Sequence, residues 1–406
     1  MRHFKKVNRC RICNLGRLKK YLNLEEQPLA NSFLKQEDIK NEKKYPLELL
    51  FCEKCKLSQL SIVVNPKLIF NKYDYLASFS KALKNHYKKL VKSLEKKNNL
   101  YDKSTVLDIG CNDGVLLNNY SKNVLNVIGI EPSNAFKKIK NKKIKVINKF
   151  FNENTANIFL RKFSKAKIIT ITNVLAHVDN INSLIKNVKK ILHSNGNLII
   201  EVPYILDMLN RSTFDLVYHE HLSYFNIISL KFLFEKNGLK IINIDKINFG
   251  ASGPSLRIYV AHNKSSFKVN KKIFTYIRNE KLKGVDDFNT YKKFEQNVKN
   301  KISKLRKKLI NLHEKNYKLA CFTAPAKGNT LLNSLNLKSN FFEFATENNH
   351  RKINKFTPGT HLKIVKDNKL INSKIKYALL LSWNYKKFFV KNSKFIKNGG
   401  KFLFPF

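Results

Sequence analysis

The sequence lacks several features that mark common classes of protein. Nowhere in its 406 residues do about 18 uninterrupted apolar residues occur, so we expect no membrane-spanning helix. The basic N-terminus, MRHFKKVNRC, is followed by no apolar run, so we expect no secretory signal peptide. These absences predict a cytoplasmic protein with no membrane partner, whose thiols stay reduced.

Acidic residues are also scarce. The chain has 29 Asp and Glu against 78 Lys and Arg, which gives a formal net charge of +49. Such an excess is typical of proteins that bind nucleic acid, acidic membranes or anionic small molecules. The lysines are scattered through every segment, however, whereas a nucleic-acid footprint should cluster on one face or arm. We therefore expect no nucleic-acid partner, although an anionic nucleotide substrate would benefit from the charge.

The chain has only six cysteines, and four of them form the pairs Cys10-x-x-Cys13 and Cys52-x-x-Cys55. This spacing is typical of metal sites and not of disulfides. Two such pairs can hold one tetrahedral Zn²⁺ through thiolates, which leaves no open coordination position for catalysis. We predict a structural zinc site with an inserted hairpin between the pairs. The alternative is that the four cysteines are small buried hydrophobic residues.

The chain of 406 residues is longer than a domain with a single hydrophobic core usually is, so two or three domains are expected. From residue 105 onward, short apolar runs alternate with helix-like stretches, which is typical of a doubly wound α/β sheet. The strands of this sheet are predicted at TVLDIG, NVIGIE, KIITIT and NLIIEV, and the block closes with an edge-like strand, PSLRIYVAH. A second, smaller α/β unit follows, with strands predicted at LACFTA, NFFEFA, LKIV and YALLLSW.

Apolar residues at helical spacing predict two long helices outside these units, at 81–97 and 291–312. We interpret both as connectors.

The segment VLDIGCNDGVLL, residues 106–117, is typical of a nucleotide site. An acidic residue ends a strand, and two glycines in the following turn let the backbone approach a nucleotide closely. The segment is not the dinucleotide fingerprint G-x-G-x-x-G. The next strand ends in Glu131, where a carboxylate can accept hydrogen bonds from ribose hydroxyls. This order favours S-adenosylmethionine over a nicotinamide cofactor or an ordinary strand–turn–helix corner. The candidate cofactor residues are Asp108, Gly110, Asn112, Asp113, Gly114, Glu131 and Asn173.

The turn TNVLAHV, which follows the strand KIITIT, lacks the Asn/Asp-Pro-Pro-aromatic sequence usual in methyltransferases that act on nucleobase amines. Its absence argues against nucleic-acid methylation. Asn173 and His177 lie in this turn and could face a ligand, or equally serve as capping or core residues.

The segment YHEHLSYF, residues 218–225, crowds two histidines, a glutamate and two tyrosines together after the strand NLIIEV. Doubly wound folds bind ligands at this rim of the sheet. Methylation of carbon requires a base that removes a weakly acidic C–H and a donor that stabilises the enolate, which neutral His and Tyr can supply. We expect one of His219 and His221 to be structural and the other catalytic, and not both to face one site from an extended strand. The alternative is a polar turn whose side chains brace one another.

Nearly the whole chain resembles the sugar C-methyltransferases, which add a methyl group to a carbon of a nucleotide-linked deoxy-keto-sugar. The motifs that carry this resemblance are PLANSF, YPLELLFCEKCKLSQL, YDYLASFS, LDIGCNDGVLL, GIEPS, TNVLAHV, EVPY, YHEHLSYF, PAKGNTLL, TPGTH, LLSWNY and GGKFLFP, in that order. The chain departs from the family pattern in GASGPSLR, within ATENNHRK, and at Thr323, where the family usually has Gly.

The resemblance implies an α/β protein with a class I methyltransferase domain, whose Rossmann-like sheet is doubly wound, and a smaller C-terminal Rossmann-like domain. The expected division is a zinc-binding module over 1–65, a helical connector over 66–100, an S-adenosylmethionine-binding methyltransferase domain over 101–265, a second helical connector over 266–315 and a substrate-binding domain over 316–406.

The resemblance also implies roles for individual residues. His221 is the expected general base, with Tyr218 and Glu220 beside it and His177 and Tyr75 lining the site. PAKGNT and TPGTH are expected to contact the substrate, and the candidate substrate-binding residues are Lys327 near a phosphate, Asn329, Asn31 and Tyr73, which could also stand in place of Tyr75.

The expected function is therefore S-adenosylmethionine-dependent C-methylation of a nucleoside-diphosphate-linked 4-keto-deoxysugar through an enolate, by a monomer or homodimer that also holds a structural Zn²⁺. Two alternatives are a zinc-ribbon RNA methyltransferase and a non-catalytic binding protein whose cofactor loop is empty.

Overall fold

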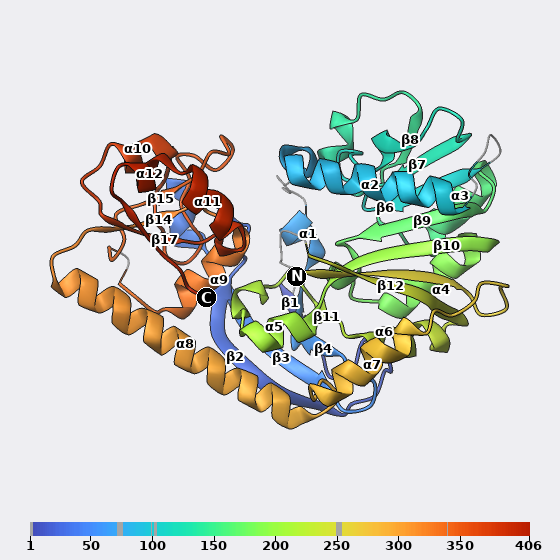
Figure 1. Cartoon of the computed structure of the whole chain (residues 1–406), viewed down its shortest axis with the longest axis horizontal. Helices are drawn as coiled ribbons and strands as arrows, with labels where there is room; N and C mark the ends of the chain where they lie inside the picture. Colours follow the sequence, from blue (N-terminus) through green and yellow to red (C-terminus); the bar gives the residue numbers. More distant parts are fainter. Residues whose placement is uncertain (1–2, 71–75, 99, 101–103, 249–253, 339) are drawn as a thin grey trace.

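The structure is a computed structural model that describes residues 3–70, 76–98, 100, 104–248, 254–338 and 340–406. The strands form a seven-stranded, a five-stranded, a four-stranded and a two-stranded sheet. Figure 1 shows the seven-stranded sheet at the right and the C-terminal sheet at the left, with a long helix running beneath the C-terminal sheet toward the bottom centre.

The seven-stranded sheet has the order β12-β13-β10-β9-β6-β7-β8. Only β13 runs antiparallel to its neighbours. This arrangement is the class I methyltransferase fold and confirms the predicted doubly wound sheet. Its strands are β6 (Thr105–Ile109), β7 (Asn126–Ile130), β8 (Ile144–Ile147), β9 (Ala166–Thr172), β10 (Leu192–Pro203), β12 (Leu239–Ile247) and β13 (Ser255–His262).

The prediction that PSLRIYVAH forms an edge strand is wrong, because β13 lies between β10 and β12. The edge is β12, which the sequence analysis did not predict. This interior strand carries Arg257, whose Nε lies 2.6 Å from Oε1 of Glu201 on β10. An ion pair within the sheet therefore satisfies the charged side chain.

Helices cover both faces of this sheet. Leu90 and Val91 of α2 (Lys81–Asn98) are buried with Val106 and Val127 on one face. The other face is covered by α3 (Glu153–Lys162) and α4 (Ile181–Ile191), with α5 (Ile205–Arg211) and α6 (Ile227–Lys236) farther along the chain. The predicted helix at 81–97 is therefore present, but it packs on the sheet instead of only linking two units.

The N-terminal sheet has the order β11-β4-β3-β2 and is antiparallel throughout. Its strands are β2 (Leu18–Pro28), β3 (Lys44–Cys52), β4 (Ser58–Leu60) and β11 (Ser223–Tyr224), while β1 (Phe4–Lys6) pairs with β5 (Ile62–Val64). The hairpin β2–β3 lies between the two cysteine pairs, as predicted. Strand β11 comes from YHEHLSYF, so the central part of the chain supplies an edge strand to the N-terminal sheet.

The C-terminal sheet is parallel, with the order β16-β15-β14-β17-β18. Its strands are β14 (Leu319–Phe322), β15 (Ala345–Thr346), β16 (Ile364–Val365), β17 (Tyr377–Leu380) and β18 (Lys401–Leu403), with helices α9 (Ala326–Ser334), α10 (Asp367–Ile371), α11 (Lys386–Asn392) and α12 (Lys394–Lys397). NFFEFA contributes only its last residue to a strand. One of its aromatic residues, Phe341, instead packs on His313, with 4.9 Å between ring centroids.

The remaining elements connect these units. They are α1 (Pro66–Phe70), α7 (Lys272–Leu282), α8 (Phe288–Glu314) and the short 3-10 helices η1 (Gln36–Asn41), η2 (Ala77–Phe79), η3 (Leu117–Asn119), η4 (Asn134–Lys138), η5 (Leu175–His177), η6 (Phe214–Leu216) and η7 (Trp383–Tyr385). Helix α8 packs on the hairpin, where the ring centroid of Tyr291 lies 4.4 Å from that of Phe51 and 4.9 Å from that of Tyr21. The predicted helical connector thus braces the N-terminal sheet.

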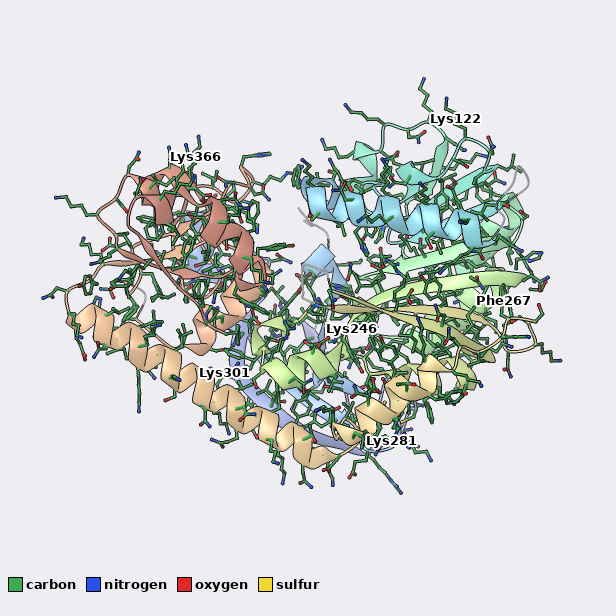
Figure 2. The ribbon with its side chains drawn as sticks, viewed as in Figure 1. Lys122, Lys246, Phe267, Lys281, Lys301 and Lys366 are labelled. Carbon is green, nitrogen blue, oxygen red and sulfur yellow. The ribbon has the colours of Figure 1, made fainter. Side chains whose placement is uncertain are left out.

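Charge is spread over the molecular surface. The labelled side chains of Lys122, Lys281 and Lys366 project from separate sides of the molecule (Figure 2). Across the described ranges, every helix is too short or too polar to cross a bilayer.

Replacing Tyr291 with Ala should lower the free energy of unfolding by about 3–5 kcal/mol, because the fully buried ring anchors α8 to the hairpin. Tyr291→Phe should cost only about 1 kcal/mol, since it loses just the hydrogen bond from the hydroxyl to the Val285 carbonyl. Denaturant unfolding measures both values. Equal losses in the two variants would contradict this account of the packing.

Candidate active site

A cavity of about 550 Å³ lies where the carboxyl ends of β6, β7 and β9 face the C-terminal sheet. Its volume lies in the range of small-molecule sites. All three parts of the chain line it, and the polar lining residues include Asn31, Asp108, Asn112, Glu131, Asn173, His177, Tyr218, Glu220, His221, Lys327, Lys352, Ser382, Asn384 and Tyr385. The structure therefore brings most of the predicted site residues together.

The loop after β6 requires glycine and a left-handed backbone. Gly110 has a φ of 78°, and a Cβ atom there would lie 2.4 Å from Cγ2 of Val174. Asn112 has a φ of 50°, and its backbone N–H donates to Oε2 of Glu131 at 2.9 Å. Oε1 of Glu131 accepts from the backbone N–H of Ser133 at 2.8 Å. These donors fix the carboxylate at the cavity wall while lone pairs remain for ribose hydroxyls.

Two other acidic residues in or next to this loop form hydrogen bonds with protein groups. Thr170 donates to Asp108 at 2.6 Å, and burial raises the pKa of Asp108 to about 7. Oδ2 of Asp113 accepts from the backbone N–H of Ser78 at 3.1 Å. Asp113 and Gly114 are not among the lining residues, so they support the loop instead of facing the cavity.

The residues of this loop and its neighbours fit S-adenosylmethionine. Gly110 keeps the backbone open to a nucleotide, and Glu131 stands at the end of the second strand. Asn173, with a φ of 57°, lines the cavity from the end of β9. These residues would hold the adenosine part of the cofactor.

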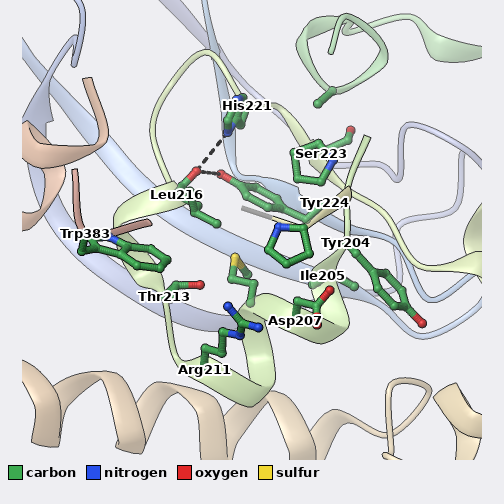
Figure 3. A pocket seen from close by; sticks show the side chains of 14 residues that line it. Tyr204, Ile205, Asp207, Arg211, Thr213, Leu216, His221, Ser223, Tyr224 and Trp383 are labelled. Atoms are coloured by element: carbon green, nitrogen blue, oxygen red, sulfur yellow. Dashed lines mark hydrogen bonds between the residues drawn. The ribbon is translucent and has the colours of Figure 1, made fainter. Parts of the chain in front are cut away.

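The two histidines of YHEHLSYF face different partners. Nε2 of His219 lies 3.2 Å from the Tyr45 carbonyl, on the hairpin. His221 faces the cavity. Its Nδ1 lies 3.0 Å from the carbonyl of Leu216, a hydrogen bond drawn in Figure 3, which shows a smaller, separate pocket that His221 also lines. The segment divides the two rings as expected, although a turn at 218–220 does this and not a strand.

The carbonyl of Leu216 determines the tautomer of His221. A carbonyl only accepts, so Nδ1 carries the proton and Nε2 presents a lone pair. That lone pair lies 3.0 Å from the hydroxyl of Tyr218. Burial lowers the pKa of His221 to about 4, and burial and then His221 lower the pKa of His177 to about 3. The two rings are 5.1 Å apart between centroids, and both imidazoles are neutral at pH 7.

A carboxyl group lies beside this pair. Glu220 is buried, and its Oε1 accepts from Nδ2 of Asn31 at 2.6 Å. Burial raises the pKa of Glu220 to about 7. Asn31 comes from the N-terminal module, so two separately selected site residues, Asn31 and Glu220, lie in contact.

The C-terminal unit contributes cationic groups. Nζ of Lys327 donates to Oδ1 of Asn384 at 2.7 Å, and burial lowers the pKa of this lysine to about 8. Nζ of Lys352 donates to the Ala324 carbonyl at 2.8 Å and lies 3.5 Å from Oε2 of Glu347. The sequence analysis did not select Lys352, although it ends the departing segment ATENNHRK.

Other expected substrate contacts lie elsewhere. Asn329 is not among the lining residues, and its Nδ2 donates to the Ala30 carbonyl at 2.7 Å. In TPGTH, Nε2 of His361 lies 2.8 Å from Oε2 of Glu42, so this turn meets the N-terminal module instead of the cavity. Asn384 and Tyr385 in LLSWNY line the cavity and were missed. Tyr73 and Tyr75 fall outside the described residues.

Thr323 has a backbone conformation that glycine adopts more easily than threonine does. Its φ is 67°, in the left-handed region that a β-branched residue rarely adopts. Two hydrogen bonds hold it there: its hydroxyl donates to Oγ of Ser382 at 2.9 Å and accepts from the backbone N–H of Ser382 at 3.0 Å. Thr323 therefore anchors the start of η7.

The four cysteines of the N-terminal module form one cluster. All four Sγ atoms lie within 4.8 Å of one another, with 3.3 Å between Cys10 and Cys55 and 3.5 Å between Cys13 and Cys52. This donor set fits a tetrahedral Zn²⁺ whose Zn–S bonds are about 2.3 Å long. None of the four lines the described cavity, so the metal is structural.

Three family models match successive parts of the chain. Residues 10–70 match a zinc binding domain, residues 79–244 a methyltransferase domain and residues 250–406 a C-methyltransferase C-terminal domain. The chain is 26% identical over 402 residues to the C-methyltransferase NovU of Streptomyces niveus, which covers 98% of this chain and 95% of that protein.

Solved structures are similar over part of the chain. Magnesium protoporphyrin IX methyltransferase from Synechocystis PCC 6803 with bound S-adenosylmethionine has a TM-score of 0.33 and 13% identity, covering 44% of this chain and 79% of that chain. An S-adenosylmethionine-dependent methyltransferase from Clostridium acetobutylicum has a TM-score of 0.34 and 17% identity, covering 48% and 95%.

The cofactor loop, the cysteine cluster and the order of the three family matches agree along the chain. The chain is therefore similar along nearly its whole length to S-adenosylmethionine-dependent C-methyltransferases, and its N-terminal part is similar to a zinc-binding module.

Proposed function

We propose that the protein methylates a carbon atom of a nucleoside-diphosphate-linked 4-keto-deoxysugar. The observation that carries this proposal is the buried, neutral His221, whose Nε2 lone pair is set by the Leu216 carbonyl inside a cavity that the cofactor loop also lines. Methylation of oxygen or nitrogen needs less acid–base machinery than the four proton-handling groups gathered here: His177, Tyr218, Glu220 and His221.

In the proposed reaction, Nε2 of His221 takes the proton from the carbon next to the sugar carbonyl. The electrons of the broken C–H bond move to the carbonyl oxygen and give an enolate. Tyr218, whose hydroxyl lies 3.0 Å from Nε2, turns its proton to that oxygen when substrate arrives, which frees the lone pair of the base. Neutral His177 adds a second N–H donor in the same place.

S-adenosylmethionine supplies an electrophilic methyl group on a sulfonium centre. Gly110, Glu131 and Asn173 would hold the cofactor at one wall of the cavity. The enolate carbon would form the new C–C bond as the methyl–sulfur bond breaks, which would leave the thioether S-adenosylhomocysteine and re-form the sugar carbonyl. Holding the two reactants in line supplies much of the rate enhancement. The proton stays on His221 until solvent removes it after the transfer.

The other wall suits the nucleotide end of the substrate. Lys327 is a buried cation and Lys352 a partly buried one, and a diphosphate would offset the cost of their desolvation. An RNA substrate is less well supported, because the basic side chains of the surface are dispersed whereas these two line the cavity.

Replacing His221 with Ala should slow both methyl transfer and exchange of the substrate C–H in heavy water by about 10²- to 10⁴-fold, the usual contribution of a general base. Mass spectrometry of a nucleoside-diphosphate 4-keto-6-deoxyhexose follows both processes. His219→Ala is the matched control, since His219 contacts the Tyr45 carbonyl and should affect stability instead of exchange. Exchange at the wild-type rate in His221→Ala would exclude this base.

The pH dependence provides a separate prediction. Burial lowers the pKa of His221 to about 4, so the imidazole stays neutral as pH falls through 6 and loses its lone pair only below about pH 5. In Glu220→Gln, which removes the carboxyl whose pKa is about 7, kcat/KM should therefore fall only below about pH 5. An acid limb near pH 6.5 would show that His221 titrates as an ordinary histidine.

A further inference from the structure

A set of contacts crosses from the C-terminal unit to the segment that holds the base. Nζ of Lys327 lies 4.1 Å from the ring centroid of Trp383. The indole N–H of Trp383 donates to Oδ2 of Asp215 at 2.6 Å. Asp215 is completely buried and belongs to η6, which precedes YHEHLSYF. The mechanism above uses neither Trp383 nor Asp215.

The other end of this set reaches His221. Asp215 is followed by Leu216, whose carbonyl accepts from Nδ1 of His221 at 3.0 Å and from the Tyr224 hydroxyl at 3.4 Å. Figure 3 shows both hydrogen bonds and the ring of Trp383 close to Leu216. Val217, which follows Leu216, is also held in place, because the hydroxyl of Thr330 in α9 donates to the Val217 carbonyl at 3.0 Å. Side chains of the C-terminal unit therefore fix the carbonyl that orients the base.

We propose that Asp215 is a positioning residue that ties the phosphate end of the cavity, through Trp383 and Lys327, to the orientation of His221. This inference rests on the proposed function in one respect, since Lys327 must meet an anionic part of the substrate.

The physical basis is the cost of a buried carboxylate. Burial raises the pKa of Asp215, while the charge of Lys327 and the indole N–H oppose that rise. The carboxylate is therefore stable only while Trp383 and Lys327 keep their places. When a phosphate binds Lys327, it stabilises the cation on which Asp215 depends, and η6 is held in the arrangement that directs Nε2 of His221 to the substrate.

Kinetics distinguish this role from simple stabilisation. Asp215→Ala removes the acceptor for the indole N–H and should lower kcat about tenfold, with a smaller change in KM. Asp215→Asn keeps an acceptor oxygen and should recover most of kcat. The matched control is Glu280→Gln, another fully buried acid, which accepts from the Ile227 backbone N–H at 2.7 Å and lies outside the cavity lining; it should lower stability and leave kcat unchanged. Wild-type kcat in Asp215→Ala, or an equal loss in Glu280→Gln, would overturn the proposal.

A spectroscopic test does not depend on methyl transfer. Trp383 is the only tryptophan in the chain, so intrinsic emission reports on it alone. Titration with thymidine diphosphate or uridine diphosphate should change this emission in the wild type, and Lys327→Met should abolish the change. Asp215→Ala should shift the emission of the free protein. No change with either nucleotide overturns the proposal, whereas a response in a protein that methylates no keto-sugar supports the link and refutes only the proposed reaction.

Discussion

The pairing of β11 with β4 is the constraint on which the arrangement of the site depends. Ser223 and Tyr224 pair with Gln59 and Ser58, and β4 follows directly after the second cysteine pair. The segment that carries the candidate base is thus an edge strand of the zinc-braced sheet. A metal bound by the four cysteines would therefore influence the candidate site through strand register, because a slip by one residue would turn every side chain of β11 to the other face.

Burial governs the protonation states in the cavity. It keeps both imidazoles neutral, raises the pKa of Glu220 to about 7 and lowers that of Lys327 to about 8. Glu220 and Lys327 would ordinarily be fully charged at pH 7, and burial brings the pKa of each close to that pH. This tuning comes from the closure of three parts of the chain around one space, since the N-terminal module, the methyltransferase sheet and the C-terminal unit each cover one side.

Much of this architecture could be predicted from local patterns. The paired cysteines, the buried strands and Glu131 at the end of the second strand depend on short spacings that the chain carries in one place. What could not be predicted depends on partners distant in sequence. The interior strand β13 carries Arg257, which pairs with Glu201 of β10. TPGTH meets Glu42 through a contact that spans about three quarters of the chain. Lys352 gave no local signal, since one lysine among many becomes distinctive only by its place in the lining of the folded cavity.

The left-handed backbone of Thr323 has a consequence for how this sequence can change. Such a conformation costs of order 1–3 kcal/mol for a residue with a Cβ, and the hydroxyl pair with Ser382 is what offsets it. A lineage that loses the serine would leave the threonine strained and would be relieved by glycine. Positions 323 and 382 should therefore change together during evolution, because a substitution at one position favours a substitution at the other.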